Sequence, residues 1–181
     1  MDDPKSRFTR LYDAHYRSVL RYALIRAAPD VAEDVVSETF LVAWRRLDDV
    51  PDQELPWLLG VARNLLRKQH ATAGRRDALA DRIAALTPHE DGWDLAERVV
   101  ERDSLLRALA ALPEKDVEAL TLVAWHGLEP RQAARVAGCP AATFHVRLHR
   151  ARKRLAARYR AQAAHPQGHA HLARTVPQEQ Q

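Results

Sequence analysis

The chain has 181 residues, of which 46% are hydrophobic, 29% charged and 6% aromatic, and its formal net charge is +4. That length allows one domain or two small ones, and the apolar fraction is too high for a wholly disordered chain. No apolar run approaches the roughly 20 residues of a membrane helix, and the polar start does not resemble a signal peptide. A single cysteine, Cys139, excludes an internal disulfide. We therefore predict a cytoplasmic protein without membrane insertion.

Apolar residues at three- and four-residue spacing predict helices along the first part of the chain. The first helix covers residues 8–23 and stops before Pro29. Asp30 is expected to cap a second helix, with a stripe that places Phe40 and Trp44 in the core. We expect both aromatic side chains to be buried.

A loop over residues 48–53 separates this helix from a third, in which Pro56 suits the first turn. No segment has the alternation of a strand. The first domain is expected over residues 6–72 and a linker over 73–93. A second domain then covers 94–160, and the tail at 161–181 is predicted to be disordered. The expected helices of the second domain are 94–112, 114–126, 130–137 and 140–160.

Acidic and basic residues alternate in blocks along the chain. Acids dominate residues 31–54, whereas residues 55–76 contain none. Residues 77–118 are acidic again, and residues 130–178 contain no carboxylate side chain. Basic blocks on helices favour a polyanionic partner, most simply nucleic acid. Solvated helical faces remain the alternative interpretation.

The segment from Glu129 to His149 has the pattern of a helix-turn-helix. The small residues Ala133 and Ala134 allow a close helix crossing, and Gly138 suits the turn before a basic helix. An ordinary helical hairpin with a basic face is the alternative. Side chains that could meet base edges are His145, Val146, His149 and Arg150, and those within reach of phosphates are Arg147, Arg152, Lys153 and Arg154.

Catalytic and metal sites find little support in the sequence. There is no Gly-rich phosphate loop and no serine, histidine and carboxylate cluster. His145 and His149 lie four residues apart but lack the glutamate that follows the first histidine of a zinc protease. We predict neither enzymatic activity nor a cofactor nor a metal.

Three segments together resemble a known family. Residues 32–46, Ala-Glu-Asp-Val-Val-Ser-Glu-Thr-Phe-Leu-Val-Ala-Trp-Arg-Arg, resemble the polymerase-binding segment of bacterial sigma factors. Residues 56–64 resemble their −10 recognition helix, and residues 112–152 resemble their −35-binding domain. This order is the layout of the extracytoplasmic-function (ECF) class. The resemblance implies an all-α fold of two small helical domains joined by a linker, the second a helix-turn-helix DNA-binding domain.

The resemblance also implies partners and residue roles. The partners would be core RNA polymerase, through its clamp helices and flap, promoter DNA, and an anti-sigma factor as a further candidate. The alternative is a helix-turn-helix regulator that does not join RNA polymerase. Polymerase-binding positions would be Asp34, Ser37 and Glu38. The −10 positions would be Asp49, in the loop that holds a flipped base, with Trp57, Arg63, Asn64, Arg67 and Lys68. The −35 positions would be Arg131, Thr143, His145, Val146, Arg147, His149, Arg150, Arg152, Lys153 and Arg154.

Overall fold

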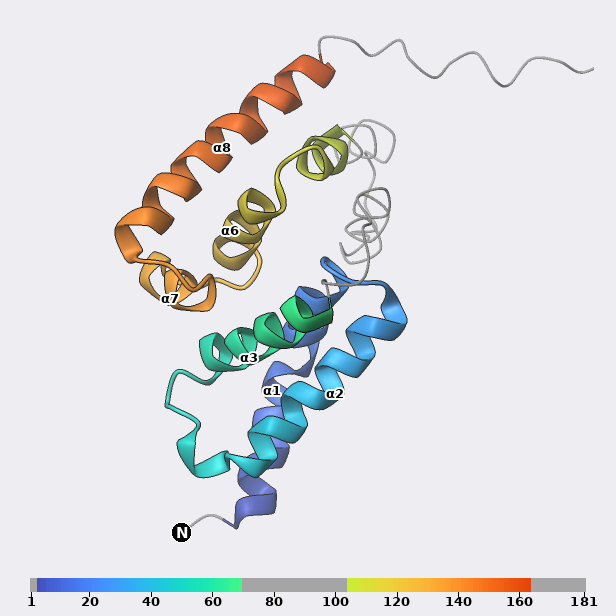
Figure 1. Cartoon of the computed structure of the whole chain (residues 1–181), viewed down its shortest axis with the longest axis vertical. Helices are drawn as coiled ribbons and strands as arrows, with labels where there is room; N and C mark the ends of the chain where they lie inside the picture. The colour runs from blue at the N-terminus through green and yellow to red at the C-terminus, as the bar shows by residue number, and fades with distance from the viewer. Residues whose placement is uncertain (1–2, 70–103, 164–181) are drawn as a thin grey trace, which may run out of the picture.

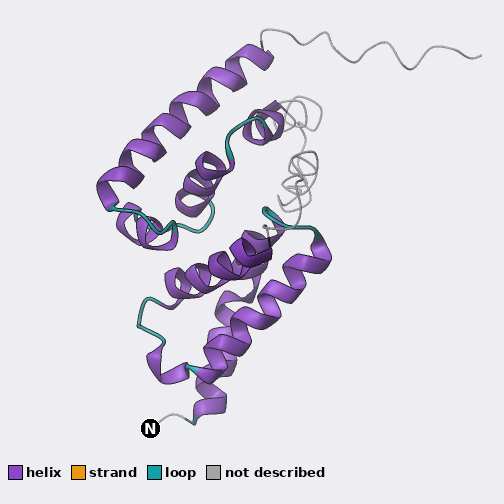
Figure 2. Ribbon diagram, in the orientation of Figure 1, coloured by secondary structure: helices purple, strands orange, loops and turns teal. Residues whose placement is uncertain are grey.

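A computed structural model describes residues 3–69 and 104–163, and regular structure in these two ranges is helical throughout (Figure 2). The predicted all-α fold is therefore confirmed. The expected linker at 73–93, the start of the helix expected from residue 94 and the tail beyond residue 163 lie outside the described residues. Within the described ranges, no helix is both long and apolar enough to span a membrane.

The first half contains three α-helices and one short 3₁₀ helix. They are α1 (Pro4–Leu24), α2 (Pro29–Arg45), η1 (Leu47–Asp49) and α3 (Glu54–Gln69). Proline stands at the start of α1 and of α2, where its missing N–H costs no helical hydrogen bond. The prediction that Asp30 caps α2 is wrong, because Ala28 is the capping residue and Asp30 lies in the first turn. There its carboxylate still interacts favourably with the helix dipole.

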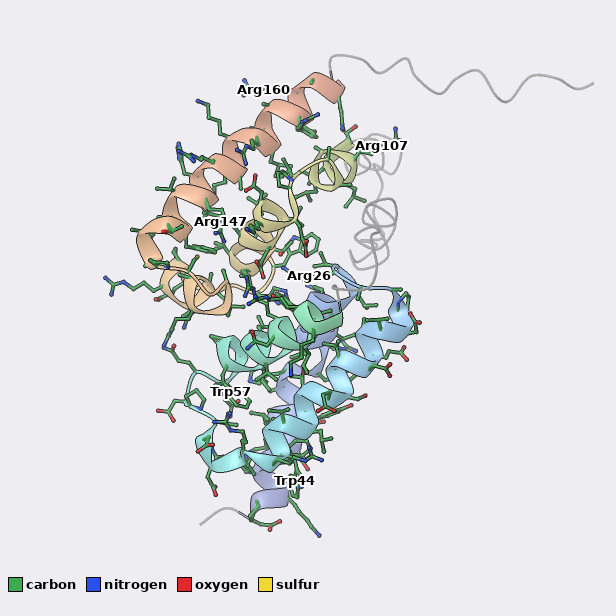
Figure 3. The ribbon with its side chains drawn as sticks, viewed as in Figure 1. Arg26, Trp44, Trp57, Arg107, Arg147 and Arg160 are labelled. Atoms are coloured by element: carbon green, nitrogen blue, oxygen red, sulfur yellow. The ribbon has the colours of Figure 1, made fainter. Side chains whose placement is uncertain are left out.

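The core of the first half is formed by one face of each helix. Leu11, Tyr22, Phe40 and Leu58 are almost completely buried. Trp44 is different, because 42% of it is exposed. The prediction that Trp44 belongs to the core is therefore wrong: Ala43, its neighbour, takes the buried position of that turn, and the indole lies at the surface (Figure 3).

The second half is built around the predicted helix pair. Helical residues 104–110 are followed by α6 (Glu114–Ala124), α7 (Pro130–Val136) and α8 (Ala141–Ala163). Gly127 and Gly138 end α6 and α7 with φ angles of 62° and 61°, a region that favours glycine. On α8 the helical spacing of Phe144, Leu148, Ala151 and Leu155 predicts a buried stripe; the first three are buried and Leu155 is partly buried.

The two halves contact each other directly. In Figure 1, α7 lies over α3, and the contacts between these two helices agree with that view. A single cluster of buried apolar residues runs through both halves. Because a domain of this size buries little apolar surface alone, the contact adds to the stability of each half.

We expect Phe40 and Trp44 to differ sharply in their effect on stability. Phe40→Ala removes a buried ring and should lower the free energy of unfolding by about 3–5 kcal/mol. Trp44→Ala should cost about 1 kcal/mol, because its main described ring contact is an edge-on pair with Phe8 at 5.1 Å. Urea denaturation followed by circular dichroism measures both. Equal losses would show that the indole is a core group.

Candidate polymerase and nucleic-acid interfaces

An aromatic groove lies between α1 and α2. Its volume is about 470 Å³, and we call it the α1–α2 groove. Tyr12 and Leu41 are exposed by 37% and 39%, so the groove presents apolar surface to solvent together with Trp44. The lining residues are Phe8, Tyr12, Tyr16, Glu33, Val36, Ser37, Phe40, Leu41 and Trp44.

One acidic side chain, Glu33, lines the α1–α2 groove, and two more are exposed on the same helix. Asp34 and Glu38 are exposed and lie four residues apart on α2, so both are on one face of the helix. Ser37, the third predicted polymerase-binding residue, lines the groove itself. An exposed apolar patch with a polar rim is typical of a protein-binding surface, and carboxylates favour a basic partner.

A second groove lies beside α3. We call it the α3 groove; its volume is about 640 Å³, within the range of small-ligand sites. Trp57 and Asn64 contribute to it from α3, and Gln53 contributes from the preceding loop. The complete lining is Arg46, Pro51, Asp52, Gln53, Pro56, Trp57, Gly60, Val61, Asn64 and Arg135.

The other predicted −10 residues have three different surroundings. Arg67 and Lys68 are exposed on the last turns of α3. Asp49 is not among the lining residues of the α3 groove and forms an ion pair with Arg46 at 3.0 Å. Arg63 points toward the second half of the chain and is only 19% exposed. The structure therefore separates Arg63 from the solvent-facing part of the predicted site.

The helix-turn-helix presents most of its predicted DNA-binding side chains to solvent. At the start of the motif, the Glu129 N–H donates to Gln132 Oε1 at 2.9 Å and so fixes the first turn of α7. Val146 is 51% exposed, which is unusual for an apolar side chain and suits contact with a base edge. Arg147 is half-buried. The other exposed members of the predicted set are Arg131, Thr143, His145, His149, Arg150, Arg152 and Lys153.

Arg154 differs from the other predicted phosphate contacts. Its Nη1 lies 2.5 Å from Oδ2 of Asp116, a carboxylate whose side chain is 6% exposed. A buried carboxylate needs a positive partner, so this arginine joins α8 to α6. The guanidinium is half-exposed, but its charge is already compensated.

A buried ionic cluster joins the two halves of the chain. The carboxylate of Glu118, on α6, accepts hydrogen bonds from the Tyr22 hydroxyl at 2.8 Å and from Arg63 Nε at 3.0 Å. Arg26 Nη2 lies 3.7 Å from the same oxygen, and its guanidinium stacks on the Tyr22 ring at 3.7 Å. We call these four residues the Glu118 cluster; Figure 3 shows Arg26 at this junction.

No sequence pattern predicts the Glu118 cluster. Arg63 was predicted to be a DNA-binding residue, and Glu118 had no predicted role. The two residues are 55 positions apart, and no local pattern links them. In the sequence, Glu118 stands out only as the last residue of an acidic block, and this position does not indicate that it pairs with Arg63.

His126 is buried beside the Glu118 cluster. Its ring meets that of Tyr22 edge-on at 5.8 Å, and its Nε2 has no hydrogen-bond partner among the described residues. Burial, with the nearby charges of Arg26 and Arg21, lowers the pKa of His126 to about 4. Burial likewise raises the pKa of the Tyr22 hydroxyl, which therefore stays protonated and can donate to Glu118.

Comparison with known proteins identifies the family. Residues 11–76 match Sigma-70 region 2, and residues 102–155 match Sigma-70, region 4. The chain is 35% identical over 130 residues to the ECF RNA polymerase sigma factor EcfG of Rhodopseudomonas palustris, covering 71% of each. It is 32% identical over 144 residues to SigL of Mycobacterium tuberculosis, covering 77% of this chain and 81% of that one.

Two solved structures show the same fold. One is the sigma factor RpoE in complex with the anti-sigma factor NepR from Bartonella quintana, with a TM-score of 0.62, 22% identity, and coverage of 84% of this chain and 96% of that one. The other is CnrH in complex with the cytosolic domain of CnrY, with a TM-score of 0.57, 23% identity, and coverage of 85% and 88%. Taken with the sequence matches, the chain belongs to the sigma-70 family of RNA polymerase sigma factors, in its ECF class.

We expect His126 to make stability fall in mild acid. Its pKa is about 4 when folded and about 6.5 when unfolded, so the unfolded state binds a proton first as the pH falls. The contribution of His126 is complete above pH 6.5 and is lost between about pH 6.5 and 4, on the order of 3 kcal/mol. Urea denaturation across this range should give a shallower dependence for His126→Phe. Parallel curves for both proteins would contradict the prediction.

Proposed function

We propose that this ECF sigma factor binds polymerase and the two promoter elements through three separate surfaces. The α1–α2 groove and its acidic rim bind the clamp helices of core RNA polymerase. The α3 groove with the exposed end of α3 binds the −10 element and holds a flipped base, and α8 reads the −35 element. The observation that carries the proposal is the separation of charge. Glu33 lines the aromatic groove, and Asp34 and Glu38 are exposed on the same helix, whereas residues 55–69 and 130–163, which include α3 and α8, contain no carboxylate side chain.

The chemistry of each surface fits its proposed partner. Opening a promoter requires no covalent step, so binding energy is enough: capture of an unstacked base offsets an unstacking cost of a few kcal/mol. Trp57 on the wall of the α3 groove offers an aromatic face for such a base. We further propose that the chain works in the cytoplasm, is not an enzyme, and binds an anti-sigma factor, as RpoE of Bartonella quintana does in its complex with NepR.

The rival function is a helix-turn-helix regulator that does not join RNA polymerase. Such a regulator needs only the second half of the chain. The α1–α2 groove argues against this alternative, because an aromatic surface with carboxylates beside it does not favour binding to the phosphate backbone of DNA. Binding to core polymerase separates the two functions.

We expect core binding to depend on the acidic rim and on Trp44. Glu38→Arg should weaken binding to core polymerase at least tenfold, and adding Asp34→Arg should abolish it, because two cations would face a basic partner. Trp44→Ala should weaken binding by about 2 kcal/mol, the size typical of an aromatic hot spot. Fluorescence titration and gel filtration with core polymerase measure both.

Glu114→Arg is the matched control, since it reverses an equally exposed carboxylate on the other half of the chain. It should leave core binding unchanged. Normal binding of the Asp34→Arg, Glu38→Arg double variant would exclude the α1–α2 groove as the polymerase surface.

We expect α8 to distinguish base reading from phosphate binding. Arg150→Ala should weaken binding to a selected −35 duplex by about 1–3 kcal/mol more than binding to a scrambled duplex. Lys153→Ala should weaken both alike and lower the salt slope by about 0.9. Lys153 is preferred to Arg154 here because Arg154 is paired with Asp116. Equal losses on both duplexes for Arg150→Ala would mean that this residue does not read bases.

A further inference from the structure

The loop between α2 and α3 has a short exposed part that lies between two residues held by α1. We call Pro51, Asp52 and Gln53 the groove tip, because all three are exposed and line the α3 groove. Directly before the tip, Val50 is buried, and directly after it Glu54 begins α3. Figure 1 shows the loop beside the first turns of α1, whose side chains are therefore placed to contact both ends of the tip.

Two side chains of α1 make these contacts. Arg7 Nη2 donates to the Val50 carbonyl oxygen at 3.4 Å, and Arg7 Nη1 lies 3.8 Å from Oδ1 of Asp48. His15 Nε2 lies 2.9 Å from Oε2 of Glu54 and donates to it, because a carboxylate has no proton to give. The side chains of His15 and Glu54 are 20% and 34% exposed, so this second contact is partly shielded from water. One helix thus holds the chain on either side of the groove tip.

Arg7 and His15 belong to one stripe of α1. They are eight residues apart with Leu11 midway, and residues four apart lie on the same face of a helix. Leu11 is almost completely buried and belongs to the apolar core. The two polar contacts therefore extend from a part of α1 that is itself fixed by packing, and a helix holds a geometry more precisely than a loop does.

The backbone of the groove tip has little support of its own. Pro51 has no N–H, and within the described residues the N–H groups of Asp52 and Gln53 donate to no backbone carbonyl. Arg135 Nη2 donates to Gln53 Oε1 at 2.6 Å, but this contact holds the end of a side chain and not the backbone. The path of the tip is therefore set by its two ends.

We propose that Arg7 and His15 are positioning residues for base reading: from α1 they hold both ends of the groove tip and so fix its side chains relative to a base in the α3 groove. The inference rests on the proposed function of that groove. Neither residue is among those that line the groove, so each acts through the tip. Discrimination between bases needs donors and acceptors at fixed positions, because a displaced group no longer matches the edge of one base only.

The first test measures the mobility of the groove tip without DNA. A nitroxide spin label is attached to Asp52→Cys in the full chain, in a Cys139→Ser background, and its rotational correlation time is measured by electron paramagnetic resonance. Arg7→Ala and His15→Leu each remove a donor to one end of the tip. Each should shorten the correlation time at least about twofold, because the tip then moves more freely.

Two further variants serve as controls for the mobility test. His15→Gln keeps an N–H donor for Glu54 and should restore a correlation time close to that of the labelled parent chain. Arg17→Ala removes an exposed arginine from the same helix and should have no effect. Unchanged mobility in both Arg7→Ala and His15→Leu would overturn the positioning role.

The second test measures base discrimination by the chain bound to core RNA polymerase. The probe is a fork-junction DNA with a short randomised single strand, from which wild-type holoenzyme selects its preferred bases. The position read by the groove tip is the one whose preference falls when Asp52→Ala and Gln53→Ala are introduced together. At that position, affinity for the preferred base is compared with affinity for each of the other three.

Arg7→Ala and His15→Leu should each lower this ratio of affinities at least about fivefold, because the tip no longer distinguishes the bases. Affinity for a probe with a scrambled single strand should stay within about twofold, because contacts to the phosphate backbone do not depend on the tip. A folding defect would instead lower both affinities together. His15→Gln should keep the ratio near the wild-type value.

The tip variant distinguishes a failure of this inference from a failure of the proposed function. If Asp52→Ala with Gln53→Ala changes the preference at no position, the groove tip reads no base, and the proposed function of the α3 groove fails together with the inference. If that variant lowers a preference but Arg7→Ala and His15→Leu do not, the groove keeps its function and only the positioning role is overturned.

Discussion

The negative charge of a buried carboxylate must be compensated by partners within the protein. The partners of Glu118 all come from the other half of the chain. Tyr22, Arg26 and Arg63 belong to α1, its end and α3, while Glu118 belongs to α6. An unpaired carboxylate in this position would carry a large desolvation cost. The arrangement of the two halves therefore satisfies this carboxylate, while the apolar contacts around it are less directional.

The same requirement explains which basic residues remain available. Arg63 and Arg154 each compensate a buried acid, so they stabilise the fold, whereas Arg67, Lys68, Arg150 and Lys153 keep their charges in solvent. A count of basic residues treats all of them alike. Only the uncompensated charges form a surface for an anionic partner. On α3, Arg67 and Lys68 belong to that surface, whereas Arg63 faces the other half of the chain.

Local sequence patterns predicted the helices well, because the spacing of apolar residues and the choice of turn residues both depend on only a few neighbouring positions. Gly138 lies in the turn between α7 and α8 as expected, and three of the four residues of the α8 stripe are buried. The error at Trp44 has a simple cause: at helical spacing Ala43 and Trp44 are neighbours, and size favoured the indole although the core accepted the smaller side chain. The contact of Arg63 with Glu118 could not be predicted, since pairing across 55 residues depends on how two finished halves pack.

The sequence separation within the Glu118 cluster also sets an order of events during synthesis. Arg63 leaves the ribosome 55 residues before Glu118, and Tyr22 precedes it by 96. At about 5–20 residues per second, the first half exists for roughly 3–10 s before its carboxylate partner has been made. During that interval α3 can fold against α1 and α2 with Arg63 uncompensated. The nascent chain therefore passes through a stage in which Arg63 lacks this carboxylate partner, and the contact between the two halves forms only after α6 has been made.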